Sequence, residues 1–260
     1  MNVQYAVQKD TVFVLEVNPR ASRTVPFVAK TTGVPFARIA TQVMAGRTLR
    51  ELGVEDPPRA PHISVKAPAF PFAKFVGARA DLGPEMRSTG EVMGIDSTFG
   101  MAFAKASDAA GRRLPIAGKV FLSVKDADKP GAVTVAQQLH EMGFEMVATE
   151  GTWRVLDAAG VPCLRINKVH EGRPHAVDLI KNREIDLIIN TPLGDETRTD
   201  DGMIRSEAYQ AGLPTIATLS AAFAAVQGIR ALRGGRAEVG SLQEFYAAAQ
   251  NSIASAVSGA

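Results

Sequence analysis

The chain is poor in cysteine and carries little net charge. Its 260 residues include a single cysteine, Cys163, which excludes an internal disulfide framework and a cysteine-rich zinc site. This cysteine usage is typical of a reducing, cytoplasmic location. The 29 basic and 27 acidic side chains leave a net charge of +2, so we expect no nucleic-acid partner.

Long hydrophobic runs are also absent. Residues 212–229 lie in a long uncharged stretch, but proline, threonine, serine and glutamine interrupt it. The stretch is too polar to cross a bilayer and instead predicts a buried strand followed by a core helix. Residues 1–20 contain four charged side chains and no apolar leader, so we expect neither a signal peptide nor a membrane attachment.

The composition is that of a globular protein with two parts. Hydrophobic residues make up 46% of the chain and charged residues 22%, enough apolar surface for a substantial core. The glycine- and arginine-containing stretch 110–115 separates two patterns of hydrophobicity. We therefore expect one domain over residues 1–111 and a second over residues 112–260.

The C-terminal half alternates between strand and helix patterns. Five short apolar runs lie at Val120–Val124, Met146–Thr149, Cys163–Asn167, Ile185–Asn190 and Thr215–Leu219. Helical patterns follow them at Ala132–Met142, Thr152–Ala159, His175–Lys181, Met203–Ala211 and Ala221–Leu232. Successive βα units of this kind predict an α/β domain with a doubly wound, five-stranded parallel sheet.

The N-terminal half is less regular. Strand patterns lie at Asn2–Val7 and Val12–Val17, and an extended proline-containing segment lies at His62–Phe75. Helical patterns lie at Val25–Thr32, Phe36–Met44 and Phe99–Ala110. The two opening strands have no earlier element to pack against, and a lone hairpin is marginally stable. This half is therefore expected to be an incomplete α+β segment. Residues 247–260, rich in alanine and serine, are expected to form a frayed end without chemistry.

Three oxygen-bearing side chains are expected to meet on the opening hairpin. Glu16 and Asn18 are two positions apart and share one strand face. Gln4 lies opposite Glu16 if the paired residue numbers sum to 20. Oxygen ligands around a carboxylate suit Mg²⁺, and Arg20 just beyond them suits phosphoryl charge. The alternative is an ordinary solvated strand face.

Polar side chains follow four consecutive strands of the C-terminal half. Each of these residues stands at the end of an apolar run or just beyond it: Ser123, Lys129, Thr149, Thr152, Lys168, Asn190 and Thr191. Because the carboxyl ends of parallel strands meet at one sheet edge, beside helix N-termini, these groups predict a phosphate-accepting pocket. The alternative is that the hydroxyls only cap helices.

Longer motifs indicate a family. The segments Met1–Gln4, Glu16–Arg20, Gly83–Gly94 and Asn167–His175 resemble the large subunit of carbamoyl-phosphate synthases, and the likeness extends to about residue 246. It implies that residues 1–111 are the end of an ATP-grasp domain and that residues 112–260 form a methylglyoxal-synthase-like regulatory domain. It also implies that the chain is the rear part of a longer protein and is inactive by itself.

For the first part, the resemblance implies an ATP-dependent ligase that phosphorylates carbamate to carbamoyl phosphate for pyrimidine and arginine synthesis. Gln4, Glu16 and Asn18 correspond to positions that hold Mg²⁺ or Mn²⁺ on the phosphates of ATP, and Arg20 to the residue that stabilises the transferring phosphoryl group. The implied partner is a glutamine amidotransferase small subunit, and the implied intact enzyme is an oligomer.

For the second part, the resemblance implies a regulatory site for a nucleoside monophosphate of the uridylate or inosinate type. The residues that line this site in the family correspond here to Lys129, Thr149, Thr152, Lys168 and Asn190. The strand-end pattern adds Thr191 to the expected site. A sixth family position is Pro192 here in place of threonine, which removes one hydroxyl donor and predicts weaker binding. Ala67 and Ala217 stand where members of the family that respond to ornithine carry residues of the ornithine site. Regulation by ornithine is therefore not expected.

The sequence also bears on two other functions. A free-standing regulatory module that docks on a separately encoded synthase remainder is the main alternative, and an in-frame continuation of the DNA upstream of Met1 would exclude it. A lyase of the methylglyoxal synthase kind needs a catalytic aspartate beside a Gly-Gly pair at the sheet edge. The one such pair, Gly234-Gly235, follows the last helix pattern, which argues against a lyase.

Overall fold

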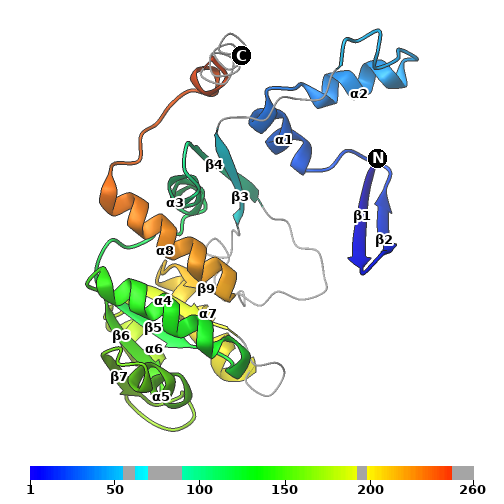
Figure 1. The fold of residues 1–260 in the computed structure, drawn as a ribbon. Coiled ribbons are helices and arrows are strands. Elements are labelled where there is room, and N and C mark those ends of the chain that lie inside the picture. Colours follow the sequence, from blue (N-terminus) through cyan, green and yellow to red (C-terminus); the bar gives the residue numbers. More distant parts are fainter. Residues whose placement is uncertain (55–61, 70–89, 192–197, 248–260) are drawn as a thin grey trace. The chain divides into compact units, whose positions relative to one another are not determined.

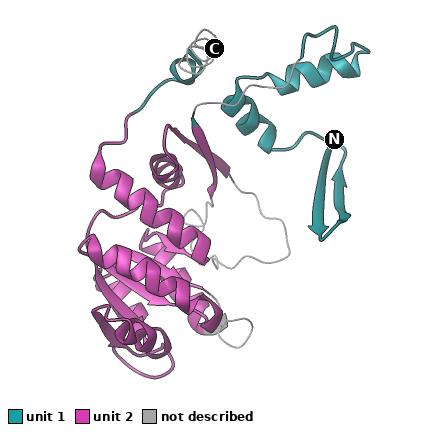
Figure 2. Cartoon of the chain, in the orientation of Figure 1, with its two compact units in different colours: residues 1–62, 239–260 teal, residues 63–238 magenta. Residues whose placement is uncertain are grey.

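The computed structural model describes residues 1–54, 62–69, 90–191 and 198–247. The chain divides into two compact units, coloured separately in Figure 2. The first unit comprises residues 1–62 and 239–260, and the second comprises residues 63–238. The contacts thus divide the chain elsewhere than near residue 111, where the sequence predicts a boundary. The two expected domains, residues 1–111 and 112–260, stay a prediction. None of the helices in the described ranges has the length and apolar content that a bilayer crossing requires.

The first unit contains a hairpin and two short helices (Figure 1). Strands β1 (Asn2–Gln8) and β2 (Thr11–Asn18) pair antiparallel, and α1 (Thr24–Thr32) and α2 (Phe36–Met44) follow. Gly33 ends α1 with φ +74°, a left-handed conformation that glycine adopts without strain. The C-terminal segment belongs to the same unit, because the Tyr246 hydroxyl donates to the Lys30 carbonyl at 2.5 Å.

The expected hairpin register is confirmed at its open end. Gln4 lies opposite Glu16, and a bulge then shifts the pairing so that Tyr5 lies opposite Val14. Seven large apolar side chains of this hairpin are exposed, with exposed fractions of 47–70%: Tyr5, Val7, Val12, Phe13, Val14, Leu15 and Val17. Within the described residues, nothing covers either face of the hairpin.

The second unit begins with an antiparallel pair that carries a helix. Strand β3 (Ile63–Ala69) pairs with β4 (Gly90–Asp96), and α3 (Phe99–Ala109) packs on them. The helix approaches so closely that a Cβ on Gly94 would lie 2.0 Å from the Ala102 carbonyl oxygen, so only glycine fits there. The extended segment expected from His62 is confirmed as far as Ala69, and residues 70–75 lie outside the described ranges.

A five-stranded parallel sheet forms the centre of the second unit. Its strands are β5 (Lys119–Ser123), β6 (Glu145–Thr149), β7 (Cys163–Ile166), β8 (Leu187–Asn190) and β9 (Thr215–Ile216), in the spatial order β7-β6-β5-β8-β9. The helices are α4 (Lys129–Glu141), α5 (Glu150–Ala158), α6 (Ala176–Lys181), α7 (Arg198–Gln210) and α8 (Leu219–Gly234). The predicted α/β fold is thereby confirmed.

Two separate apolar clusters show that the sheet is covered on both faces. One cluster joins Val120 and Leu122 of β5 to side chains of α4, α5 and α8, and the other joins Phe121 to side chains of α6 and α7. The alternation along β5 sends neighbouring side chains to opposite faces. The chain order of strands reverses between β5 and β8, and such a switch point is where open α/β sheets bind ligands.

The last strand is shorter than expected. Leu219 was predicted to end it, but this residue begins α8. The reason is the Thr218 hydroxyl, which accepts a hydrogen bond from the Ala221 amide at 3.2 Å and caps the helix.

Candidate functional site

A cavity of about 430 Å³ lies at the carboxyl ends of the parallel strands. Its lining includes all six residues that the sequence predicts for the effector site: Lys129, Thr149, Thr152, Lys168, Asn190 and Thr191. They come from the segments that follow β5, β6, β7 and β8, as the strand-end pattern indicates. Pro192, which the resemblance places in the same site, lies outside the described residues.

Two buried threonines are oriented by backbone amides. The Thr152 hydroxyl oxygen accepts from the Val124 amide at 3.0 Å, and the Thr191 hydroxyl oxygen accepts from the Lys125 amide at 3.0 Å. Each hydroxyl keeps its own proton for a further partner, because a hydroxyl both donates and accepts. The two contacts therefore turn both threonines into hydrogen-bond donors for a ligand in the cavity.

The other buried polar side chains of the cavity form two contacts. The Thr149 hydroxyl donates to the Ser123 hydroxyl at 3.1 Å. The Asn190 amide donates to Asp201 at 3.0 Å, and Asn190 is only 2% exposed. The side-chain carbonyl oxygen of Asn190 is buried and has no hydrogen-bond partner among the described residues.

Both ammonium groups of the predicted site line the cavity, in different electrostatic settings. The Lys129 ammonium nitrogen lies 2.6 Å from an Asp126 carboxylate oxygen. The hydrogen bond and the positive charge that Lys129 supplies lower the pKa of the Asp126 carboxyl. A Cβ on Gly151 would lie 3.3 Å from the Lys129 nitrogen, so glycine leaves space for this ammonium group. Lys168 is exposed at the rim of the lining and has no carboxylate at ion-pair distance within the described ranges.

Sequence reasoning missed the acidic part of the lining. Asp126, Asp200 and Asp201 also face the cavity, together with His170, whose Nδ1 lies 2.6 Å from Asp200. Asp126 stands three residues before Lys129, a spacing that is visible in the sequence. The other two aspartates come from the first turn of α7, which was expected to begin only at Met203.

The hairpin brings together the three oxygen-bearing side chains predicted there. Glu16 Oε1 accepts from the Gln4 amide at 2.7 Å and from the Asn18 amide at 2.9 Å. Arg20 instead donates to the Ala21 carbonyl at 3.0 Å. A cation would fit this donor set in type, since it offers one carboxylate and two amides that can turn their oxygens inward. No group of three His, Cys, Asp or Glu side chains in the described ranges is arranged to hold a metal.

Two family models match the chain in separate segments. Residues 1–52 match the carbamoyl-phosphate synthase L chain, ATP binding domain, and residues 131–217 match the MGS-like domain. The first match falls within the first compact unit and the second within the other.

Curated relatives match over almost the whole chain. The carbamoyl phosphate synthase large chain of Rhodopirellula baltica is 52% identical over 251 residues, which are 95% of this chain and 23% of the relative. That of Synechocystis is 51% identical over 246 residues, 94% of this chain and 23% of the relative. The chain thus spans about a quarter of the relatives it matches.

Among solved structures, methylglyoxal synthase from Elizabethkingia anophelis is similar with a TM-score of 0.37 and 20% identity, covering 44% of this chain and 79% of that one. This likeness is too weak to support an assignment. The family matches and the curated relatives carry the assignment instead: the chain corresponds to a C-terminal portion of the carbamoyl phosphate synthase large chain, with the end of the ATP-binding domain followed by the MGS-like domain.

Proposed function

We propose that the parallel-sheet domain binds a nucleoside monophosphate of the uridylate or inosinate type and so regulates the ATP-dependent synthesis of carbamoyl phosphate. The convergence of the six predicted residues on one cavity carries this proposal. Its volume of about 430 Å³ falls within the range of small-molecule pockets. Two lysines supply positive charge, and Thr152 and Thr191 supply oriented donors, which is the chemistry that a phosphate group requires.

Titration of the purified chain with uridine and inosine 5′-monophosphates tests the proposal. Isothermal calorimetry should show saturable binding, and Lys168→Met should weaken it by about 10- to 160-fold, the equivalent of the 1.5–3 kcal/mol of a hydrogen bond to a charged group. Lys181→Met removes a lysine that pairs with Glu207 outside the cavity and serves as the control. Equal affinity of Lys168→Met and wild type for both nucleotides would contradict the assignment.

We propose further that Gln4, Glu16 and Asn18 belong to the magnesium–ATP site of the intact large chain. When bound, the cation would neutralise phosphate charge. Glu16 supplies the carboxylate, the two amides supply neutral oxygens, and Arg20 would turn from the Ala21 carbonyl towards the transferring phosphoryl group.

In this chain the same hairpin faces are exposed, so water is not excluded from them. The purified chain is therefore expected to make no carbamoyl phosphate from ATP, bicarbonate and ammonia. The glutamine amidotransferase small subunit and an oligomeric assembly belong to the proposed intact enzyme. ATP-dependent formation of carbamoyl phosphate by this chain would contradict the expectation.

A further inference from the structure

The loop that joins β7 to α6 brings a lysine and two other polar side chains to the cavity. It comprises residues 167–175, and Asn167, Lys168 and His170 line the cavity. We propose that Asp178, which lies outside the cavity lining, is the positioning residue that holds this loop so that Lys168 can reach a bound anion. The role in binding rests on the proposed effector function, whereas the role in loop order does not.

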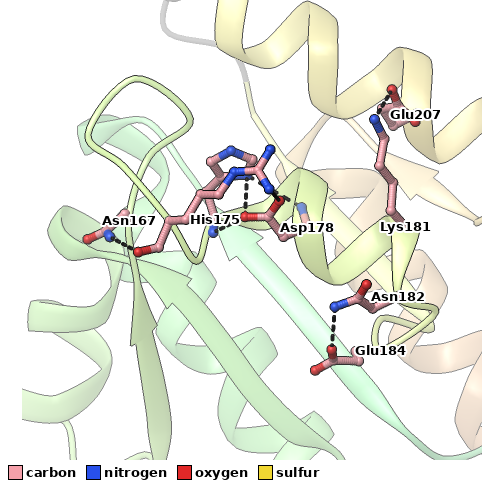
Figure 3. Close-up of polar contacts among 8 residues, drawn as sticks. Asn167, His175, Asp178, Lys181, Asn182, Glu184 and Glu207 are labelled. Carbon is pink, nitrogen blue, oxygen red and sulfur yellow. Dashed lines mark hydrogen bonds and ion pairs between the residues drawn. The ribbon is translucent and has the colours of Figure 1, made fainter.

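Asp178 contacts the end of the loop through both of its carboxylate oxygens. Oδ2 accepts from the His175 amide at 3.1 Å, and Oδ1 lies 3.4 Å from Arg173 Nη1. In return, His175 Nδ1 accepts from the Asp178 amide at 3.4 Å, a reciprocal capping box at the start of α6. Figure 3 shows His175 and Asp178 joined in this way.

The residues that Asp178 holds in turn clamp the beginning of the loop. The Asn167 amide donates to the Pro174 carbonyl at 3.2 Å, and the Asn167 side chain donates to the Arg173 carbonyl at 3.4 Å. The next residue, Lys168, is thereby held beside the β7 end. A turn closes on it, since its amide donates to Glu171 Oε2 at 2.9 Å. The order of contacts therefore runs from Asp178 through residues 173–175 to Asn167 and Lys168.

The side chains of Asp178 and His175 are largely protected from water, although most of the loop is exposed. Residues 170–174 are exposed, and Val169 is the loop side chain that packs against the apolar cluster under α6 and α7. In contrast, the Asp178 side chain is 19% exposed and that of His175 only 9%. Hydrogen bonds of the partly buried carboxylate face little competition from solvent. Polar anchoring at Asp178, more than apolar packing, thus determines the path of this loop.

Hydrogen exchange in the ligand-free chain tests the loop role directly. Asp178→Ala is expected to speed exchange of the Asn167, Lys168 and Glu171 amides by about tenfold, because it releases the clamp on the loop. Asp178→Asn keeps the shape and one carbonyl acceptor, so an intermediate effect is expected. Glu207→Gln is the matched control, because it removes a carboxylate that pairs with Lys181 of the same helix at 3.2 Å, outside the cavity.

Calorimetry with uridine 5′-monophosphate tests the binding role. Asp178→Ala is expected to weaken binding by about tenfold, the lower end for residues that act through a ligand-contacting neighbour, and Glu207→Gln to leave it unchanged. A purely helix-capping role would speed exchange only in residues 176–181 and leave loop exchange and affinity as in wild type, which would overturn the proposal. So would equal effects of Asp178→Ala and Glu207→Gln.

Two further results separate the possibilities. If Asp178→Ala does not fold, Asp178→Asn carries the same two measurements, and wild-type values for it would overturn the proposal. If the wild-type chain binds no nucleotide, the proposed effector function fails, and the exchange measurement alone decides whether Asp178 orders the loop.

Discussion

Replacing Thr152 by valine should affect stability and binding by separate routes. Thr152 is 1% exposed, and its hydroxyl accepts the buried Val124 amide at 3.0 Å. Valine has nearly the same shape but no acceptor, so the amide loses its partner at a cost of about 1–3 kcal/mol. For a unit of 150–250 residues, each kcal/mol lowers the melting temperature by about 2–4 °C. Calorimetric melting should therefore show a fall of roughly 2–12 °C.

The same substitution removes one of the two oriented donors of the cavity. A hydrogen bond to a charged group contributes about 1.5–3 kcal/mol, so affinity for uridine 5′-monophosphate should fall by about 10- to 160-fold. Thr152→Ser should recover most of the affinity, because it keeps the hydroxyl. Thr215→Val is the matched control, since the Thr215 hydroxyl donates to the Leu213 carbonyl and lies outside the cavity lining. Wild-type affinity in Thr152→Val would refute the assigned donor, and an unchanged melting temperature would refute the hydrogen bond.

Three further outcomes follow from burial and charge. Burial, and secondly the charge of Asp157, raise the Cys163 pKa to about 12, so Ellman's reagent at pH 8 should react at least ~100-fold more slowly with the folded chain than with the unfolded one. Burial alone would raise the pKa of Asp96, but the hydrogen bond and charge of Lys105 outweigh burial, and the net pKa is lowered. The Asp96 carboxylate therefore stabilises the fold above about pH 4, and this contribution is lost as the pH falls further. Urea titrations between pH 2 and 7 should show that the free energy of unfolding decreases less on acidification in Lys105→Met than in wild type. An equal decrease in the two proteins would contradict the pairing of Asp96 with Lys105. Limited subtilisin digestion should cut residues 2–18 well before residues 119–234, as mass spectrometry of early fragments can establish, and equal rates would count against the exposed hairpin.

The parallel-sheet domain was predictable because its local signals agree with one another. Apolar runs, helical patterns and a glycine such as Gly143, which has φ +80° just after α4, all mark the same boundaries. The site residues followed from the rule that strand ends meet at one edge. Neither inference needed knowledge of long-range contacts beyond the parallel order of the strands.

What could not be predicted depends on contacts between distant segments. Strand β4 begins at Gly90 and contains Gly94, and glycines weaken a strand pattern in the sequence. Its pairing with β3 spans the intervening residues 70–89, so no hairpin signal joins the two. Likewise, Asp201 and His170 reach the cavity only because α7 and the loop after β7 dock at the switch point.

The ion pair between Asp126 and Lys129 has one more consequence. The Lys129 ammonium group holds the Asp126 carboxylate at 2.6 Å, so an anion that approaches Lys129 would compete with this carboxylate. Asp126 is largely exposed and can swing into water when a better anion arrives. An anion that makes further contacts with the cavity lining would therefore compete for Lys129 better than chloride or inorganic phosphate, which would make few such contacts.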